Sequence, residues 1–211
     1  MLALLHTSPV HVPVFDALRD ADHPDLELRH LVAEDLLERA RREGPLAVTD
    51  DVRDALVRAA DAGARAVLCT CSTIGAVAEA QAAAVGVPVL RVDRPMAAAA
   101  VAAGPRITVL AALESTLGPT ADLVEEEARR AARPVSVRTL LVDGAWDRFT
   151  AGDTEGYVRS VAAAADAVTD ADVIVLAQAS MAPAGGLTTV NLPVLSSPRP
   201  GRAAAAPART R

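Results

Sequence analysis

The hydrophobic positions of the chain alternate between short runs rich in Leu and β-branched residues and longer Ala-, Arg- and Glu-rich stretches with helical spacing. In Val52–Ala62, for example, Val52, Ala55, Leu56 and Ala59 fall on one helix face. Such alternation is typical of βα units, which build a largely parallel sheet. The pattern predicts strands at Leu2–His6, Leu26–Leu31, Arg65–Thr70, Val87–Val92, Arg106–Ala111, Val135–Leu140, Asp172–Ala177 and Pro193–Ser196.

The two halves of the chain resemble each other. Pro88-Val89-Leu90 matches Pro193-Val194-Leu195 at an offset of 105 residues. Leu5-His6-Thr7-Ser8 resembles Leu113-Glu114-Ser115-Thr116 at an offset of 108 residues. Repetition of this kind indicates an internal duplication.

We therefore expect an α/β fold of two pseudo-symmetric, doubly wound parallel-sheet halves, 1–101 and 106–200, with a cleft between them. Residues 201–211 contain no large apolar residue and are expected to form a frayed helix or a flexible tail. In open parallel sheets, ligands bind beyond the carboxyl ends of the strands. The small polar clusters follow predicted strands: His6-Thr7-Ser8, Cys71-Ser72-Thr73, Asp93-Arg94, Glu114-Ser115-Thr116, Gln178-Ala179-Ser180 and Ser196-Ser197-Pro198-Arg199.

Composition narrows the possible chemistry. The 211 residues are 51% hydrophobic and 23% charged, enough to bury a core in one α/β domain or in two small halves. All 21 basic residues are Arg, so a lysine Schiff base, lysine-anchored pyridoxal phosphate and a Walker phosphate loop are excluded. A net charge of −6 and an aromatic content of 2% argue against nucleic-acid partners.

The chain lacks membrane and signal segments and has few cysteines and histidines, which limits its expected location and metal sites. No apolar run reaches the roughly 18 residues that span a bilayer, and the N-terminus lacks a basic signal-peptide region. A soluble cytoplasmic protein without a membrane partner is expected. The only cysteines are Cys69 and Cys71, and the chain has 4 His, so neither a disulfide framework nor a zinc site is expected.

The most informative segment surrounds Cys71. A buried strand is predicted to run into Cys71-Ser72-Thr73, and a helix to follow from about Ile74. The dipole and the N–H groups of a helix N-terminus favour a thiolate and bind carboxylates. Alternatively, Ser72 and Thr73 are only helix caps and Cys71 is a small buried filler, as we expect for Cys69.

Cys71-Ser72-Thr73 resembles the Cys-Asn-Thr element of the aspartate/glutamate/hydantoin racemase superfamily. The segment Val175–Ala182 resembles that superfamily's second element, in which a Gly-Cys pair ends the strand, and Ile107–Thr116 resembles its mid-chain strand. The resemblance covers nearly the whole chain in length and topology. It implies two α/β halves with an active site between them. It also implies proton abstraction beside a carboxylate by two thiols, without a cofactor.

The sequence departs from this family pattern at Gln178, which stands at the second thiol position. Glutamine forms hydrogen bonds but neither takes up nor releases a proton at ordinary pH. A symmetric two-thiol racemase is therefore unavailable. Cys71 remains as a one-sided acid/base, with Gln178 orienting the substrate or stabilising an enolate-like oxygen. The superfamily also includes single-thiol arylmalonate decarboxylases, although their surviving thiol lies in the second half.

Other polar residues have two readings each. His6 is either a catalytic or binding residue, with Thr7 and Ser8 beside it, or a structural loop histidine. Ser115 and Thr116 are either helix caps or carboxylate ligands, and Ser180 would line the wall beside Gln178. The repeated Arg94 and Arg199 are either guanidinium forks for an acidic substrate or partners of nearby acids. The remaining histidines are expected at the surface: His11, His23 and His30.

The leading hypothesis is a cofactor-independent racemase or isomerase that acts on a small carboxylate, with Cys71 as acid/base and no metal. A single-thiol decarboxylase or a cis–trans isomerase of a small dicarboxylate is the alternative. An inactive protein that binds a small ligand is a third reading. The resemblance also implies a possible homodimer.

Overall fold

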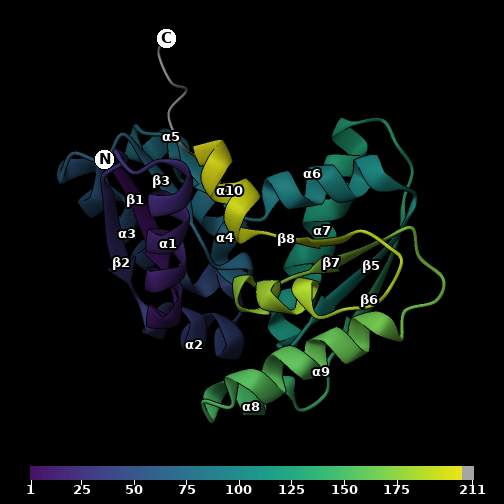
Figure 1. Cartoon of the computed structure of the whole chain (residues 1–211). Helices are drawn as coiled ribbons and strands as arrows, with labels where there is room; N and C mark the ends of the chain where they lie inside the picture. The colour runs from purple at the N-terminus through teal and green to yellow at the C-terminus, as the bar shows by residue number, and fades with distance from the viewer. Residues whose placement is uncertain (206–211) are drawn as a thin grey trace. The chain divides into compact units, whose positions relative to one another are not determined.

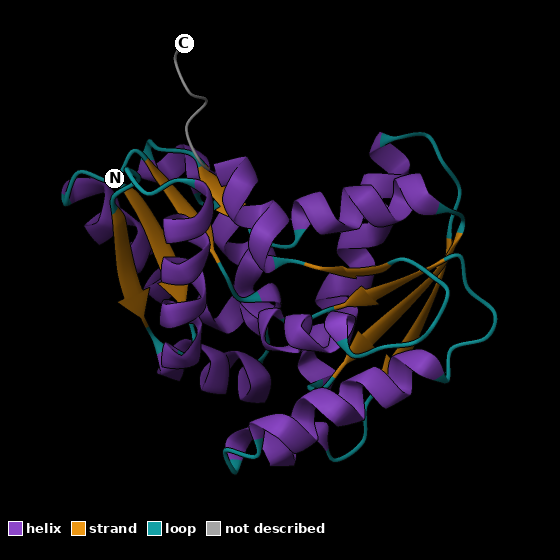
Figure 2. Ribbon diagram, in the orientation of Figure 1, coloured by secondary structure: helices purple, strands orange, loops and turns teal. Residues whose placement is uncertain are grey.

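The computed structural model describes residues 1–205, which divide into two compact α/β units. Unit 1 contains Met1–Val92 and the C-terminal helix that begins at Pro198, and unit 2 contains Asp93–Ser197. Figures 1 and 2 show that each unit consists of one sheet with helices packed on it. All strand pairs in both sheets are parallel. The α/β class predicted from the alternating pattern is therefore confirmed.

Unit 1 is built on four strands in the order β2-β1-β3-β4. Residues of β1 alternate between its two faces, as the two-residue period of a strand requires. Ala3 and Leu5 pack against α2, α3 and α4, whereas Leu2 and Leu4 pack with Phe15 of α1 and Ala205 of α10. The elements are β1 (Leu2–His6), η1 (Pro9–His11), α1 (Val12–Asp22), β2 (Leu28–Val32), α2 (Glu34–Glu43), η2 (Pro45–Val48), α3 (Thr49–Asp61), β3 (Ala66–Cys69), α4 (Ser72–Ala80), α5 (Ala82–Val85), β4 (Val89–Arg91) and α10 (Pro198–Ala205).

Unit 2 repeats this topology with the order β6-β5-β7-β8. Ile107 and Val109 face α6 and α7, and Leu110 faces α8 and α9. The elements are α6 (Arg94–Ala103), β5 (Arg106–Ala111), α7 (Glu114–Arg130), β6 (Ser136–Leu141), α8 (Ala145–Thr150), α9 (Thr154–Asp166), β7 (Val173–Leu176), η3 (Ala179–Gly186) and β8 (Val194–Ser196). The predictions for β1 and β5 have the observed bounds, and the other strands shift by one or two residues.

The structure divides the chain at Val92, earlier than the expected boundary at residue 101. The reason is that α6 packs on α7 and β7, so it belongs to unit 2. For residues 201–205 the structure favours the helical reading over the flexible tail. Residues 201–205 complete helix α10, which packs on α1 and β3 of unit 1, and residues 206–211 lie outside the described part.

Small residues and one buried cation dock α10 on unit 1. A Cβ atom added at Gly201 would lie 2.0 Å from the carbonyl oxygen of Val92, so the helix backbone contacts the strand end directly. The guanidinium of Arg202 is fully buried and donates through Nη2 to Asp22 Oδ2 at 3.0 Å. This close approach explains why a helix without large apolar residues packs here.

We expect Gly201→Ala to destabilise the protein by about 2 kcal/mol, because the added methyl group overlaps the Val92 carbonyl and forces α10 outward. Thermal or urea unfolding measures the change. Gly118→Ala in α7 is the matched control, since a Cβ there meets nothing within 4 Å, and its effect should stay below about 1 kcal/mol. Equal effects of the two substitutions would contradict this packing.

Candidate active site

Cys71 lies where the carboxyl end of β3 leads into α4, as the sequence predicts. It is the N-cap residue of α4 with an extended backbone (φ −109°, ψ 117°), and its side chain is partly exposed. Ser72 and Thr73 follow in the first turn and are buried. Cys69 is 1% exposed, and its thiol donates to the carbonyl oxygen of Cys71 at 3.6 Å. Cys71 is therefore the accessible thiol, and Cys69 belongs to the core.

Strand register shows which residues of the two units are equivalent. Leu5 pairs with Cys69 in unit 1, and Leu110 pairs with Leu176 in unit 2. Two residues beyond these strand positions, Gln178 takes the place of Cys71. The same registers make Leu2 equivalent to Ile107, an offset of 105 residues.

The alignment of His6-Thr7-Ser8 with Glu114-Ser115-Thr116 was therefore wrong by three residues. The structural counterparts of Thr7 and Ser8 are Ala112 and Leu113. The two segments contain similar residue types, but they lie just beyond the paired strands. Their correspondence is found by counting onward from the strand register, not by matching residue types.

The side chain of Gln178 is held in one orientation. Its Oε1 accepts hydrogen bonds from Ala112 N at 2.7 Å and from Leu113 N at 3.1 Å. Both amides precede α7, at the positive end of that helix. Because a carbonyl oxygen accepts and an amide nitrogen donates, Nε2 of Gln178 is left as a donor at the carboxyl edge of the sheet.

The equivalent amides of unit 1 belong to Thr7 and Ser8. Among the backbone hydrogen bonds formed in turns, loops and caps of residues 1–205, none is donated by Thr7 N or Ser8 N. The side chain at the position of Gln178 is here the thiol of Cys71, which offers no amide oxygen to them. The two units thus present different chemistry on one scaffold: a thiol in unit 1 and a fixed amide donor in unit 2.

His6 lies in a buried hydrogen-bonded chain rather than in an open loop. Its Nδ1 is 2.7 Å from Thr70 Oγ1, and its Nε2 is 2.8 Å from Nδ1 of His30. His30 in turn approaches Asp16 Oδ1 at 3.3 Å through Nε2. Burial lowers the pKa of His6 to about 3 and the pKa of the neighbouring His11 to about 4. Both ring nitrogens of His6 are occupied, so the structure favours its structural reading.

The surface position expected for His30 was incorrect. The side chain of His30 is only 17% exposed. Its neighbours in sequence are polar, but β2 places its ring within hydrogen-bond distance of His6. No local sequence pattern reveals a partner 24 residues away.

The two arginines expected as substrate forks are engaged with acids. Arg94 donates to Glu126 at 3.2 Å and to Glu127, both on α7. Arg199 donates to both oxygens of Asp22 at 2.7 Å. The structure favours the alternative reading, in which these arginines partner nearby acids.

The remaining predicted residues of unit 2 lie near the ends of β5 and β7. Ser115 and Thr116 occupy the first turn of α7, and the hydroxyl oxygen of Ser115 is buried without a partner among the described residues. Ser180 Oγ lies 2.8 Å from the hydroxyl of Tyr157, whose pKa burial raises to about 12. Sequence reasoning missed this role of Tyr157, which holds Ser180 from α9.

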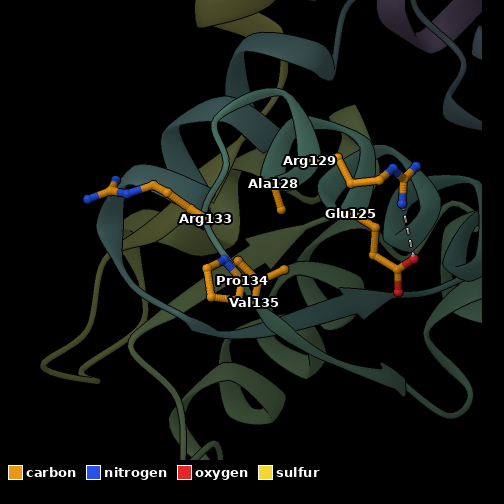
Figure 3. A pocket seen from close by; sticks show the side chains of 6 residues that line it. All are labelled: Glu125, Ala128, Arg129, Arg133, Pro134 and Val135. Carbon is orange, nitrogen blue, oxygen red and sulfur yellow. Dashed lines mark ion pairs between the residues drawn. The ribbon is translucent and has the colours of Figure 1, made fainter.

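Unit 2 has one hollow at the carboxyl edge of its sheet, near Gln178, and another at the amino edge. One, of about 210 Å³, adjoins the Gln178-bound amides, and its lining includes Glu114, Asp143, Asp147 and Trp146. The other, of about 350 Å³, lies where α7 ends and β6 begins, at the opposite end of the sheet (Figure 3). Its polar side chains are Arg129, Arg133 and Glu125, and it contains none of the predicted site residues.

Within residues 1–205, the structure holds no group of three or more His, Cys, Asp or Glu side chains arranged to bind a metal ion. It also holds no helix with the length and apolar character needed to cross a membrane.

The sequence matches the Asp/Glu/Hydantoin racemase family over residues 11–204, so the chain belongs to that family. No curated protein sequence matches significantly. Glutamate racemase RacE1 from Bacillus anthracis superposes with a TM-score of 0.70 at 14% identity, covering 97% of this chain and 79% of that one.

Two further solved structures share the fold. Aspartate racemase from Picrophilus torridus has a TM-score of 0.66 at 13% identity, over 94% of this chain and 88% of that one. A mutant of arylmalonate decarboxylase has a TM-score of 0.64 at 22% identity, over 97% of this chain and 91% of that one. The fold is thus shared by racemases and by a decarboxylase.

The buried histidines predict how stability depends on pH. His6 and His11 are neutral in the folded protein, with pKa values of about 3 and about 4 against 6.5 when unfolded. Their contribution to the free energy of unfolding is fully present above pH 6.5. It is lost as the pH falls, because the unfolded chain then binds protons that the folded chain does not bind. Each proton changes the free energy of unfolding by about 1.4 kcal/mol per pH unit.

We therefore expect the free energy of unfolding, measured with urea, to fall steeply from pH 6.5 to pH 4. His6→Gln should reduce that slope by about one proton, whatever its effect on stability at pH 7. An unchanged slope in the variant would show that His6 is protonated in the folded state.

Proposed function

We propose that this protein is a cofactor-independent, racemase-like enzyme in which a single thiol, that of Cys71, exchanges a proton with the carbon beside a carboxylate. Membership of the family supports the reaction class. The partly exposed position of Cys71 at the start of α4 supports its role, because a substrate can reach the thiol there. The thiolate removes the proton, and the thiol returns it.

The groups around Cys71 suit a carboxylate. Ser72 and Thr73 lie at the N-terminus of α4, where backbone N–H groups bind anions. Thr7 and Ser8 carry the unit 1 amides that correspond to those bound by Gln178. In the proposal, these donors hold the substrate carboxylate and stabilise the charge that develops on it as the proton leaves.

The observation that carries the proposal is the fixed orientation of Gln178. Its oxygen is bound by Ala112 N and Leu113 N, and its nitrogen is a donor that moves no proton. The position equivalent to Cys71 thus lacks an acid or base. Chemistry with one thiol is one-sided, so proton exchange is expected to retain configuration.

A decarboxylase is the second candidate, favoured by the same observation. Loss of CO₂ from a substituted malonate leaves an enediolate, which needs only one proton. The thiol of Cys71 supplies that proton to the carbon, and the resulting thiolate is reprotonated from water. One thiol is sufficient for this reaction, whereas inversion of configuration requires a donor on the opposite face as well.

Proton exchange in heavy water tests the proposal. The protein is incubated with amino acids, hydantoins and substituted malonates, and the α-hydrogen is followed by NMR. We expect deuterium to enter at least one of these substrates with retained configuration. Formation of a deuterated monocarboxylic acid from a malonate would indicate that the protein is a decarboxylase.

Cys71→Ala should lower the exchange rate by at least about a hundredfold, since it removes the acid/base. Cys69→Ala is the matched control and should leave exchange unchanged, because Cys69 is buried in the core. Equal rates in wild type and Cys71→Ala would refute the role of Cys71. No exchange with any compound would favour the ligand-binding protein.

A further inference from the structure

We propose that unit 1 binds a small apolar carboxylate at the amino edge of its sheet, with Arg65 as the partner of the carboxylate group. The site is a hollow of about 290 Å³, at the low end of the range for small-molecule pockets. It lies at the opposite end of the strands from Cys71. Its lining residues are Met1, Leu2, Leu26, Arg65, Ala66, Pro88, Leu90 and Ala205.

The wall of this hollow is apolar and rests on fixed strands. Leu2 and Ala66 are paired neighbours on β1 and β3, and Leu90 on β4 pairs with Leu68 of β3. Leu2 is 1% exposed, whereas Leu26, Ala66 and Leu90 remain partly exposed. An apolar ring or short chain placed here would remove the remaining apolar surface from water.

Among the lining residues of the described part of the chain, Arg65 has the only charged side chain. It is exposed, and no carboxylate within residues 1–205 forms an ion pair with it. A guanidinium beside an apolar wall selects an anion, and its paired N–H donors match the two oxygens of a carboxylate.

The corresponding corner of unit 2 shows what is missing in unit 1. Arg65 N donates to the carbonyl oxygen of Met1 at 3.1 Å, and Asp172 N donates to that of Arg106 at 2.8 Å. Together with the strand registers, these bonds make Arg65 equivalent to Asp172 and Met1 equivalent to Arg106.

In unit 2 this corner holds both members of an ion pair. Arg106 donates through Nη2 to Asp172 Oδ1 at 2.6 Å and through its backbone N to Oδ2 at 2.9 Å. The bonds from Arg106 lower the pKa of the Asp172 carboxyl. In unit 1 the position of the acid is taken by the cation Arg65, and no acid within residues 1–205 pairs with it. A carboxylate from a ligand would supply the anion that this corner lacks.

Titration with two probes of the same shape tests the proposal. Hexanoate and hexanamide are added to the ¹⁵N-labelled protein, and amide shifts are followed by NMR. We expect hexanoate to shift the amides of Leu2, Ala66 and Leu90, and to bind about tenfold more tightly than hexanamide, because only hexanoate pairs with Arg65.

Arg65→Gln should remove this preference and bring both probes to the same affinity. Arg58→Gln, at an exposed position of α3, is the matched control and should keep the preference. Ala66→Leu fills the hollow and should weaken both probes. Cys71→Ala should leave hexanoate binding unchanged, which separates this site from the proposed catalytic one.

Three results would overturn the proposal. The first is equal affinity for hexanoate and hexanamide in the wild type. The second is a hexanoate preference that survives Arg65→Gln. The third is the absence of saturable shifts at the amino edge, including the case in which shifts appear only around Cys71.

Discussion

The hydrogen bonds from Ala112 N and Leu113 N to Oε1 of Gln178 decide what unit 2 offers to a reaction. They occupy two amides at the positive end of α7 with a neutral oxygen, and they leave only donor hydrogens on the side chain. The equivalent position in unit 1 carries a thiol. One topology used twice therefore gives two sheet edges with different chemistry, and a thiol stands at only one of the two equivalent positions.

The parallel sheets make this comparison possible. Because every strand pair is parallel, the carboxyl ends of β1 and β3 lie at one edge of unit 1, as do those of β5 and β7 in unit 2. The amino ends lie at the opposite edges, where Arg65 and the Arg106–Asp172 pair occupy equivalent corners. The two corners differ in one respect: in unit 2 the arginine forms an ion pair with Asp172, whereas in unit 1 no acid within residues 1–205 pairs with Arg65.

The sequence predicted the strands and the position of Cys71 because both depend on local patterns. β1 and β5 are short apolar runs buried on both faces, and Cys71 follows such a run directly. Other features depend on partners far apart in sequence, such as Arg94 with Glu126 and Arg199 with Asp22, at separations of 32 and 177 residues. The docking of helix α10 escaped prediction because it depends on the missing side chain of Gly201 and on the buried Arg202, which hydrophobic spacing does not reveal.

Amide hydrogen exchange of the wild-type protein, followed by NMR, tests the fixed orientation of Gln178 most directly. The account predicts slow exchange at Ala112 and Leu113, whose N–H groups are bound by Oε1, and faster exchange at the equivalent Thr7 and Ser8. Gln178→Ala should abolish the difference. Fast exchange at Ala112 and Leu113 in the wild type would contradict the account, because Gln178 would then be free to turn.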